Sequence, residues 1–438
     1  MKKTTLILLL LLPVIMIAQS GNALLEQTIG KQKAIIEALY LKLHASPELS
    51  TMEANTAAYL KQSLREMGFS IVDSLGYYSF AAILQNGKGP VVLYRTDMDG
   101  LPVKEQTGLP FASQVMMQKG SENVPVMHAC GHDIHMSSWL TTARIMVDLK
   151  KQWSGTLVLL AQSAEETGQG AKKAVASAAF SRLPQPDIQL AMHDHAELPA
   201  GVAGFCDEYA LAAVDMMNIT IRGKGGHGAV PQQSIDPVVL ASQYVLAIQS
   251  IVSRNLSPND PAVITVGAIN GGTAGNIIPD QVVLKLTIRS YSAASRQLIL
   301  DRLKTIGDNL AIAAGLDKDH LPVFDLLDMT IPSVYNDPKL GARLREVLNR
   351  SIGSSAVATV KPVMIGEDFG VYDQQATHIP SYLMWIGTVA PARKALAEQG
   401  KAELYTLHSS RFAPDYALAI PGAVRIMTTC LLDILARK

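Results

Sequence analysis

The chain has 438 residues, which is too long for one compact core, so its length predicts two domains. Hydrophobic residues make up 48% and charged residues 17%, a composition that excludes a disordered chain. The formal net charge is zero and no block of basic residues stands out, so nothing in the charge favours nucleic acid as a partner.

The first 23 residues have the layout of a secretory signal peptide. Two lysines precede a nearly continuous apolar run, Leu6–Ala18, and small residues follow it up to Ala23. This run is shorter than the roughly 20 residues that a membrane-spanning helix needs. We therefore expect export to the periplasm or the medium, with cleavage between Ala18 and Ala23 and no stable membrane anchor. An uncleaved N-terminal anchor is the alternative.

Helices and strands alternate in the first part of the remaining chain. Apolar residues at helical spacing predict a helix over 25–43, and a second helix ends near Gly68. Two strands are predicted at 80–84 and 91–95, joined by a turn rich in glycine. This alternation is typical of an α/β fold.

Acidic residues follow the second of these strands. Asp97 and Asp99 stand in the sequence Arg95-Thr96-Asp97-Met98-Asp99, at the carboxyl end of the strand. Carboxylates in this place either orient the ligands of a metal or cap the next turn, and the sequence leaves both readings open.

The most informative stretch is Met127–His135, which reads MHACGHDIH and leads into a helix that ends near Leu149. It brings Cys130, His132 and His135 into nine residues. Thiolate and imidazole groups bind a borderline divalent cation such as zinc. The alternative is a buried cysteine among solvated histidines.

Two further strands are predicted to end in ligand-type residues. The buried-type strand Gly155–Gln162 is followed by Glu165 and Glu166, and the strand Ile188–Met192 is followed by His193. Adjacent carboxylates repel one another in a buried place unless a cation lies between them. One glutamate would then coordinate the cation while its neighbour handles protons; a solvated turn is the alternative. Strand ends of this kind build the sites of open α/β sheets.

The middle of the chain predicts a separate α+β domain at 211–327. Its elements form a βαββα unit with an antiparallel sheet of at most four strands: 214–222, 236–253, 262–269, 281–289 and 294–314. His227, Asn276 and Arg289 are its notable polar residues, each on its own more typical of a structural role.

The α/β character then returns, with a helix over 337–350, a strand over 381–387 and a helix near 416–436 that contains Pro421. The middle domain is therefore predicted as an insertion in a discontinuous domain made of 24–210 and 328–438.

The three cysteines of the chain cannot form a disulfide framework. If Cys130 binds a metal, Cys206 and Cys430 either pair with one another or remain free.

Seven motifs, in this order, resemble those of a known family. They are RTDMDGLP (95–102), MHACGHDIH (127–135), AEETGQGAK (164–172), MHDHAELPAG (192–201), GKGGHGAVP (223–231), GEDFG (366–370) and LHSSRF (407–412). The family is that of the co-catalytic metallopeptidases, which includes aminoacylases and carboxypeptidase G-like enzymes. The chain is most similar to its amidohydrolase branch of hippurate hydrolase, N-acyl-L-amino-acid amidohydrolases and auxin-conjugate hydrolases.

The resemblance implies a fold and a metal site. It implies a phosphorylase/hydrolase-like α/β catalytic domain with an inserted ferredoxin-like domain that serves as a lid and in dimerisation. It implies two divalent metal ions, zinc or manganese, with Cys130 as the bridging ligand and Glu165 as the general base. The five implied ligands are Cys130, His132, Glu166, His193 and His408.

The resemblance also implies partners and a reaction. His227 would contact the substrate, in the site of the partner subunit of a homodimer, and Asn276 and Arg289 are further candidates for substrate binding. The implied reaction is hydrolysis of N-acyl amino acids by a metal-activated water. A dipeptidase or carboxypeptidase of the same mechanism is the first alternative, and a non-catalytic metal-binding protein on this fold is the remote one.

One motif departs from the branch. An apolar residue, an aromatic residue and a proline usually follow the ligand histidine there, whereas this chain has Asp194, His195 and Ala196. We expect these three residues to line the mouth of the site and to alter substrate preference, with Asp194 or His195 as a competing ligand.

Overall fold

The computed structural model describes residues 23–374 and 379–437. The predicted signal peptide, apart from its last residue, lies outside the described residues. Two compact units make up the chain. The α/β unit runs up to Glu208 and includes Tyr335–Lys361 and the chain from Val371 onward, and the inserted unit comprises Tyr209–Val334 and Pro362–Gly370.

The inserted unit takes in two segments that the sequence assigns to the α/β domain, 328–334 and 362–370. Backbone hydrogen bonds explain the difference. The Val214 N–H donates to the Ile331 carbonyl at 2.9 Å, and the Ala212 N–H donates to the Ile365 carbonyl at 3.1 Å. Pairing of this kind joins segments that are far apart in the sequence, so local patterns do not reveal it.

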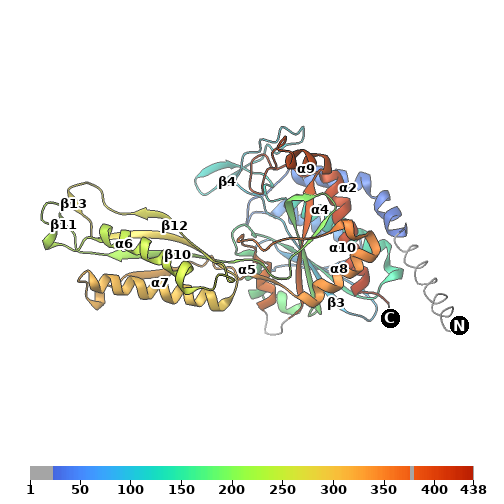
Figure 1. Ribbon diagram of the computed structural model, residues 1–438. Helices are drawn as coiled ribbons and strands as arrows, with labels where there is room; N and C mark the ends of the chain where they lie inside the picture. Colours follow the sequence, from blue (N-terminus) through green and yellow to red (C-terminus); the bar gives the residue numbers. More distant parts are fainter. Residues whose placement is uncertain (1–22, 375–378, 438) are drawn as a thin grey trace. The chain divides into compact units, whose positions relative to one another are not determined.

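The α/β unit contains a mixed eight-stranded sheet (Figure 1). Its strands, in spatial order, are β1 (Ser70–Val72), β2 (Phe80–Asn86), β6 (Gly155–Gln162), β3 (Val91–Asp97), β7 (Ile188–Pro199), β18 (Ser381–Val389), β8 (Ala203–Phe205) and β17 (Val357–Thr359). The four central strands, β6, β3, β7 and β18, are parallel. Both β6 and β18 are buried along their whole length, which is typical of parallel strands covered on both faces.

The main helices of this unit form a packed layer. α4 packs against α2, α10 and strand β3, and α10 also packs against α8 and β18. Their apolar side chains join those of the sheet in one large core. The helices are α2 (Lys33–His44), α3 (Ala54–Glu66), α4 (His132–Asp148), α5 (Gly170–Ala176), α8 (Pro338–Ile352), α9 (Pro391–Glu398) and α10 (Tyr416–Ile434).

Helix α10 is, among the described residues, the single helix whose length and composition would allow it to cross a membrane. It is 67% buried within the unit, where it packs as a core helix. Pro421 lies inside this helix, which nevertheless begins at Tyr416. All three cysteines are free and buried, so Cys206 and Cys430 do not pair.

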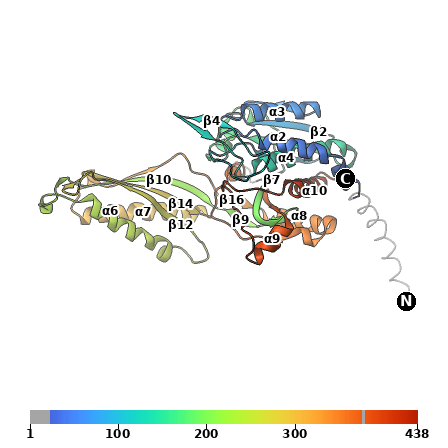
Figure 2. The same ribbon diagram turned by 90° about the horizontal axis from the view of Figure 1, so that it is seen from above.

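The inserted unit has a four-stranded antiparallel sheet and two helices (Figure 2). Its elements are β10 (Ala213–Arg222), α6 (Pro237–Ser250), β12 (Val263–Asn270), β14 (Gln281–Ser290), α7 (Ala293–Ala313) and β15 (Val323–Leu326), with strand order β12-β14-β10-β15. Alternate side chains of β10 and β14 pack against α6 and α7. The fourth strand, β15, completes a ferredoxin-like βαββαβ arrangement.

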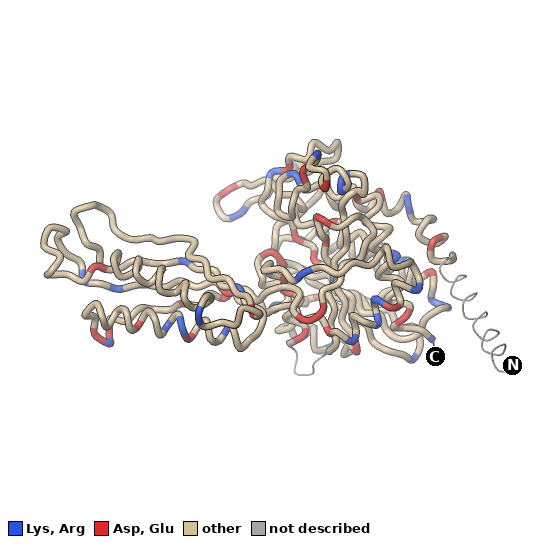
Figure 3. Tube along the Cα trace, in the orientation of Figure 1, with Lys and Arg blue, Asp and Glu red and all other residues tan. Residues whose placement is uncertain are grey.

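The glycine-rich segment 223–228, which follows β10, is partly a strand. Its residues Gly226 and His227 form β11, which pairs with β13 (Ile277–Ile278). The Gly228 N–H also donates to the Asn276 carbonyl at 2.9 Å. Figure 3 shows basic and acidic residues interspersed along the trace of both units, in agreement with the zero net charge.

A buried ion pair ties the end of α2 to α4. The His44 ring lies 2.7 Å from Asp133 through Nδ1 and 3.2 Å from Glu105 through Nε2. Burial alone would lower the pKa of His44, but the hydrogen bonds and charges of the two carboxylates raise it to about 10. His44 is therefore charged at neutral pH and holds two carboxylates in a buried place.

We expect His44→Leu to lower the free energy of unfolding at pH 7 by about 3–5 kcal/mol, because the variant leaves two buried carboxylates without their cation. The stabilisation from His44 is complete below pH 6.5 and is lost as the pH rises through about 10, because folding raises the pKa. Denaturation curves at pH 6, 8 and 10 measure this loss, which the variant should lack. The exposed pair of His320 with Asp317 supplies the control, and His320→Leu should change little. Equal losses in the two variants would contradict the assignment.

Candidate metal centre

The candidate site lies at the carboxyl ends of three adjacent parallel strands. β3 ends at Asp97, β6 leads into the turn that carries Glu165 and Glu166, and β7 carries His193. The sequence places His193 just beyond its strand, whereas β7 continues to Pro199 and His193 lies within it. Because neighbouring parallel strands end at one edge of a sheet, these side chains meet there.

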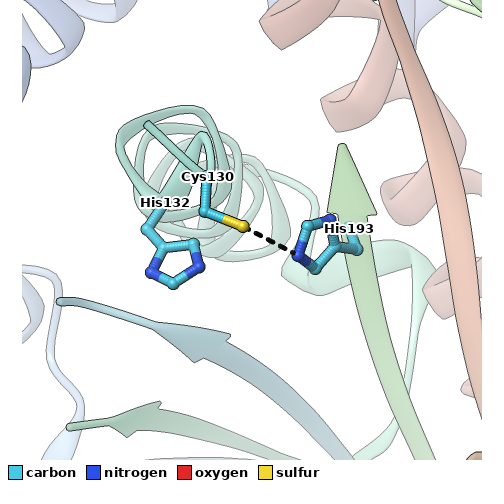
Figure 4. A group of neighbouring side chains, drawn as sticks. All are labelled: Cys130, His132 and His193. Carbon is cyan, nitrogen blue, oxygen red and sulfur yellow. Dashed lines mark hydrogen bonds between the residues drawn. The ribbon is translucent and has the colours of Figure 1, made fainter. Parts of the chain in front are cut away.

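Cys130 lies at the centre of the cluster, just before α4. Its Sγ lies 3.6 Å from Nε2 of His193, which projects from β7 (Figure 4). On the other side, Nε2 of His408 lies 3.3 Å from the same sulfur. A cysteine sulfur that lies close to two imidazole nitrogens is placed as a bridging ligand would be.

Backbone carbonyls fix the orientation of two imidazole rings. Nδ1 of His132 donates to the Asp99 carbonyl at 2.7 Å, and Nδ1 of His193 donates to the Asp194 carbonyl at 3.0 Å. A carbonyl oxygen only accepts, so the proton of each neutral ring is on Nδ1. The lone pair is then on Nε2, which is the atom that faces the cluster, as in metal-binding histidines.

The paired glutamates complete the cluster. Oε1 of Glu166 lies 3.4 Å from Nε2 of His408 and 3.9 Å from Nε2 of His132. Oε2 of Glu165 lies 4.0 Å from the same atom of His132. The structure therefore brings together all six residues that the sequence indicates as ligands or base.

The chemistry of the donor set fits a cation. Within the described part of the chain, Nε2 of His132 and Oε1 of Glu166 are buried and have no hydrogen-bond partner. Burial, followed by the charges of Glu166 and Glu165, raises the pKa of Cys130 well above its usual value. A nearby cation would accept the lone pairs of these two buried atoms. It would also lower the pKa of Cys130, because it stabilises the thiolate.

Three overlapping groups have ligand atoms that all lie within 4.8 Å of one another. They are Cys130, His132 and His193; Cys130, Glu166 and His408; and His132, Glu165 and Glu166. Cys130, His132 and Glu166 each belong to two of these three groups, so neighbouring cation sites built from them would share ligands.

His135 belongs to a fourth group, with Asp97 and His132, but both of its nitrogens are engaged. Nδ1 lies 2.7 Å from Oδ1 of Asp97, and Nε2 accepts the Asp194 backbone N–H at 3.0 Å. A backbone N–H only donates, so Nε2 keeps no lone pair for a metal. His135 is therefore a structural neighbour of the cluster.

Arg95 is a residue that the sequence reasoning missed. It is fully buried, and its guanidinium donates to Asp97 at 2.7 Å and to Oε1 of Gln162 at 3.0 Å. Burial alone would raise the pKa of Asp97, but His132, His135 and Arg95 hold it well below its usual value. A buried-type strand that ends in Arg-x-Asp was the signal that could have indicated this pair.

The prediction that Asp194, His195 and Ala196 line the mouth of the site is wrong for Asp194, which is fully buried. Successive residues of a strand point to opposite faces, so Asp194 points away from the face of its neighbours. Its carboxylate lies against Gly131 and 3.5 Å from Nε2 of His135. The rings of His193 and His195 both lie 5.4 Å from the Trp385 ring. Among the described residues, no ligand group contains Asp194 or His195.

The three candidates for substrate binding lie in the inserted unit. His227 is exposed on β11, and the Asn276 carbonyl pairs with the next residue, Gly228. Arg289 lies near the far end of β14, where its guanidinium lies beside Gly366. Eight residues of extended chain separate this end from Gln281, a span of about 26 Å. The unit thus brings His227 and Asn276 together but not Arg289.

Comparison with known proteins decides the family. The sequence model of the family described as Peptidase family M20/M25/M40 matches residues 93–408 of this chain, which include every residue of the cluster. The chain belongs to this family.

Individual relatives agree with the M20 assignment. The chain is 35% identical over 350 residues to N-acetyl-L-cysteine deacetylase of Bacillus subtilis, covering 79% of this chain and 78% of that one. It is 32% identical over 386 residues to N-acetyldiaminopimelate deacetylase of Leuconostoc citreum, covering 87% and 92%. A dinuclear metal-binding M20 peptidase of Bacillus subtilis has a similar structure, with a TM-score of 0.76, 26% identity and coverage of 93% and 99%. The predicted family, fold class and amide-hydrolysing enzyme are confirmed.

We expect His135→Asn to keep the full metal content of the wild type with an affinity lowered about 10- to 100-fold, because His135 supports the ligands without being one. The asparagine amide retains a donor near the position of Nδ1. His132→Asn should instead lose metal, because the wild-type ring presents its free Nε2 to the cluster. Metal analysis of the dialysed proteins measures the difference. An equal loss of metal in the two variants would indicate that His135 is itself a ligand.

Proposed function

We propose that this M20 enzyme hydrolyses the amide bond of N-acyl amino acids with two divalent cations. Its ligands in this proposal are Cys130, His132, Glu166, His193 and His408. The observation that carries it is the position of the Cys130 sulfur between two imidazole nitrogens, 3.6 Å from His193 and 3.3 Å from His408. Glu165 lies close to the same cluster, 4.0 Å from Nε2 of His132, and the proposal assigns it proton transfer rather than a ligand role.

A pair of divalent cations held by these residues would supply a nucleophile at neutral pH, because divalent cations lower the pKa of bound water towards about 7. The carboxylate of Glu165 accepts the proton of the attacking water and then delivers it to the leaving nitrogen. The Glu165 backbone N–H donates to Oδ1 of Asp99 at 3.2 Å, which holds this base in place. Zinc or manganese fits the mixed donor set, because thiolate and imidazole suit zinc and carboxylate suits manganese.

The names of the relatives support a small acyl group. Both relatives described above are named as deacetylases of N-acetylated amino acids. Arg289 is the candidate to bind the free carboxylate of the amino acid, because a guanidinium forms two parallel hydrogen bonds with a carboxylate. The second candidate function is that of a dipeptidase or carboxypeptidase with the same mechanism.

We expect the purified enzyme to hydrolyse N-acetyl amino acids faster than free dipeptides, and to lose activity when chelated. Glu165→Gln should keep the metal but lose activity by about 10²- to 10⁴-fold, because the amide cannot accept the proton. Glu197→Gln, which changes an exposed glutamate on β7, is the matched control. A fully active Glu165→Gln variant would remove the general base from the mechanism, and faster hydrolysis of dipeptides would favour the second function.

We further propose a homodimer through the inserted unit. β12 is an edge strand of its sheet, with Val263 and Ile269 exposed, and edge strands pair readily with another chain. His227 and Arg289 are at opposite ends of this unit, so a single small substrate that contacts both would take them from two chains. This arrangement supports a role for His227, together with Asn276, in the partner's site.

The exported location is also a proposal, and one purification tests it together with the dimer. The protein recovered from the periplasm or medium should begin after a cleavage between Ala18 and Ala23 and should have twice the chain mass in solution. Mass spectrometry and light scattering measure the two quantities. An intact N-terminus would contradict cleavage. A mass in solution equal to that of one chain would contradict the dimer. If β12 forms the interface, the variant Ile269→Lys should dissociate the dimer into monomers.

A further inference from the structure

The turn Ser163–Glu166 presents both the proposed base and a proposed ligand. Its second residue, Ala164, has a φ of +57°, in the left-handed region that residues other than glycine seldom adopt. A left-handed residue here directs Glu165 and Glu166 to the same cluster. An unfavourable backbone conformation of this kind persists only where its surroundings hold it.

Side chains bind four consecutive backbone N–H groups of this turn. Ser163 donates to Oγ of Ser79 at 2.9 Å, and Ala164 donates to Oε1 of Glu53 at 2.8 Å. Glu165 and Glu166 donate to the two carboxylate oxygens of Asp99, at 3.2 and 3.0 Å. Two buried carboxyl groups thus hold the backbone of the turn, Glu53 at Ala164 and Asp99 at Glu165 and Glu166.

Glu53 comes from a distant segment, just before α3, and is fully buried. It accepts hydrogen bonds from the Ala164 N–H, from the Ser163 hydroxyl and from the Thr51 N–H at 3.0 Å. Every one of these partners donates a hydrogen bond to the Glu53 carboxyl group. Two of the three donors belong to the turn.

The helix that follows Glu53 makes no use of its side chain. Glu53 occupies the N-cap position of α3 but makes no side-chain capping hydrogen bond. The start of α3 is instead held by Glu48, which accepts the Asn55 N–H at 3.2 Å and the Thr56 N–H at 2.7 Å. Two buried glutamates in one segment therefore have separate partners, the helix for Glu48 and the turn for Glu53.

We propose that Glu53 is a positioning residue, which holds Ala164 in its left-handed conformation and thereby sets the placement of Glu165 relative to Glu166. This inference rests on the proposed roles of these two glutamates. Among the described residues, Glu53 belongs to none of the candidate ligand groups, and in this proposal it acts through the backbone of the turn. This role has a consequence that a purely structural role would not have. Removal of the Glu53 carboxyl group should weaken metal binding and slow turnover, in addition to any loss of stability.

The test compares Glu53→Ala with Glu48→Ala, its matched control in the same segment. Zn²⁺ or Mn²⁺ titration of the metal-free protein measures affinity, and amide hydrogen exchange of residues 163–166 in the metal-free protein measures the order of the turn. Steady-state hydrolysis of an N-acetyl amino acid gives kcat and KM. Thermal denaturation reports the loss of stability in each variant.

We expect Glu53→Ala to weaken metal affinity and lower kcat by about 10- to 100-fold, with KM nearly unchanged and faster exchange at Ala164. Glu48→Ala should lose stability but keep affinity and kcat. Glu53→Gln should recover most of the activity, because its carbonyl accepts the Ala164 N–H and its amide donates to the Ser163 hydroxyl. Equal kcat and metal affinity in Glu53→Ala and Glu48→Ala would overturn the proposal, as would equal losses in Glu53→Gln and Glu53→Ala.

Ser163→Ala covers the case in which Glu53→Ala does not fold. It removes one of the two hydrogen bonds between Glu53 and the turn, so the proposal requires a smaller loss of affinity and kcat in the same direction. Wild-type values in a folded Ser163→Ala protein would then reject it. A wild-type protein that binds no metal would instead reject the proposed function, so the two failures are distinguishable.

Discussion

The structure depends on gathering negative charge at one buried place. Five carboxylates, those of Glu53, Asp97, Asp99, Glu165 and Glu166, lie at or near the ends of β3 and β6, and like charges in a low dielectric repel one another strongly. Backbone amides neutralise part of this charge at Glu53 and Asp99, and Arg95 neutralises part of it at Asp97. The remaining charge lies beside the histidines and the thiol, where two cations would complete the balance. The polar residues of the site are thus arranged around a concentration of acidic groups, which a bound cation would help to offset.

Much of the fold could be predicted from local patterns. The strand Gly155–Gln162 was predicted with its observed bounds, because a continuous apolar run between glycine and polar residues has few other readings. The gathering of the proposed ligands in one cluster could be predicted too, since their residue types are rare and their motifs specific. Partners that join distant segments could not: the hydrogen bonds of Glu53 to Ala164 and of Arg95 to Gln162 link residues more than 60 positions apart. Asp194 was misplaced because its strand continues past His193, and the alternation of a strand then turns its carboxylate into the interior.

The two units place their candidate functional residues in different ways. In the α/β unit, parallel strands bring ligand-type residues to one edge, so the metal centre arises from the topology of the sheet. In the inserted unit, the polar candidates are spread along an antiparallel sheet, with His227 and Asn276 at one end of β14 and Arg289 at the other. Recognition of a small substrate by all three would depend on assembly, whereas the five proposed metal ligands all come from the α/β unit of one chain.

The order of the cluster along the chain has a consequence for biogenesis. Cys130 is the first of the proposed ligands and His408 the last, so 278 positions separate the two ends of the set. Until almost the whole polypeptide has been synthesised and has folded, the coordination sphere is missing an imidazole. If His408 is a ligand, as proposed, a truncated product that ends before it would lack one group of the coordination sphere however well its remaining parts fold.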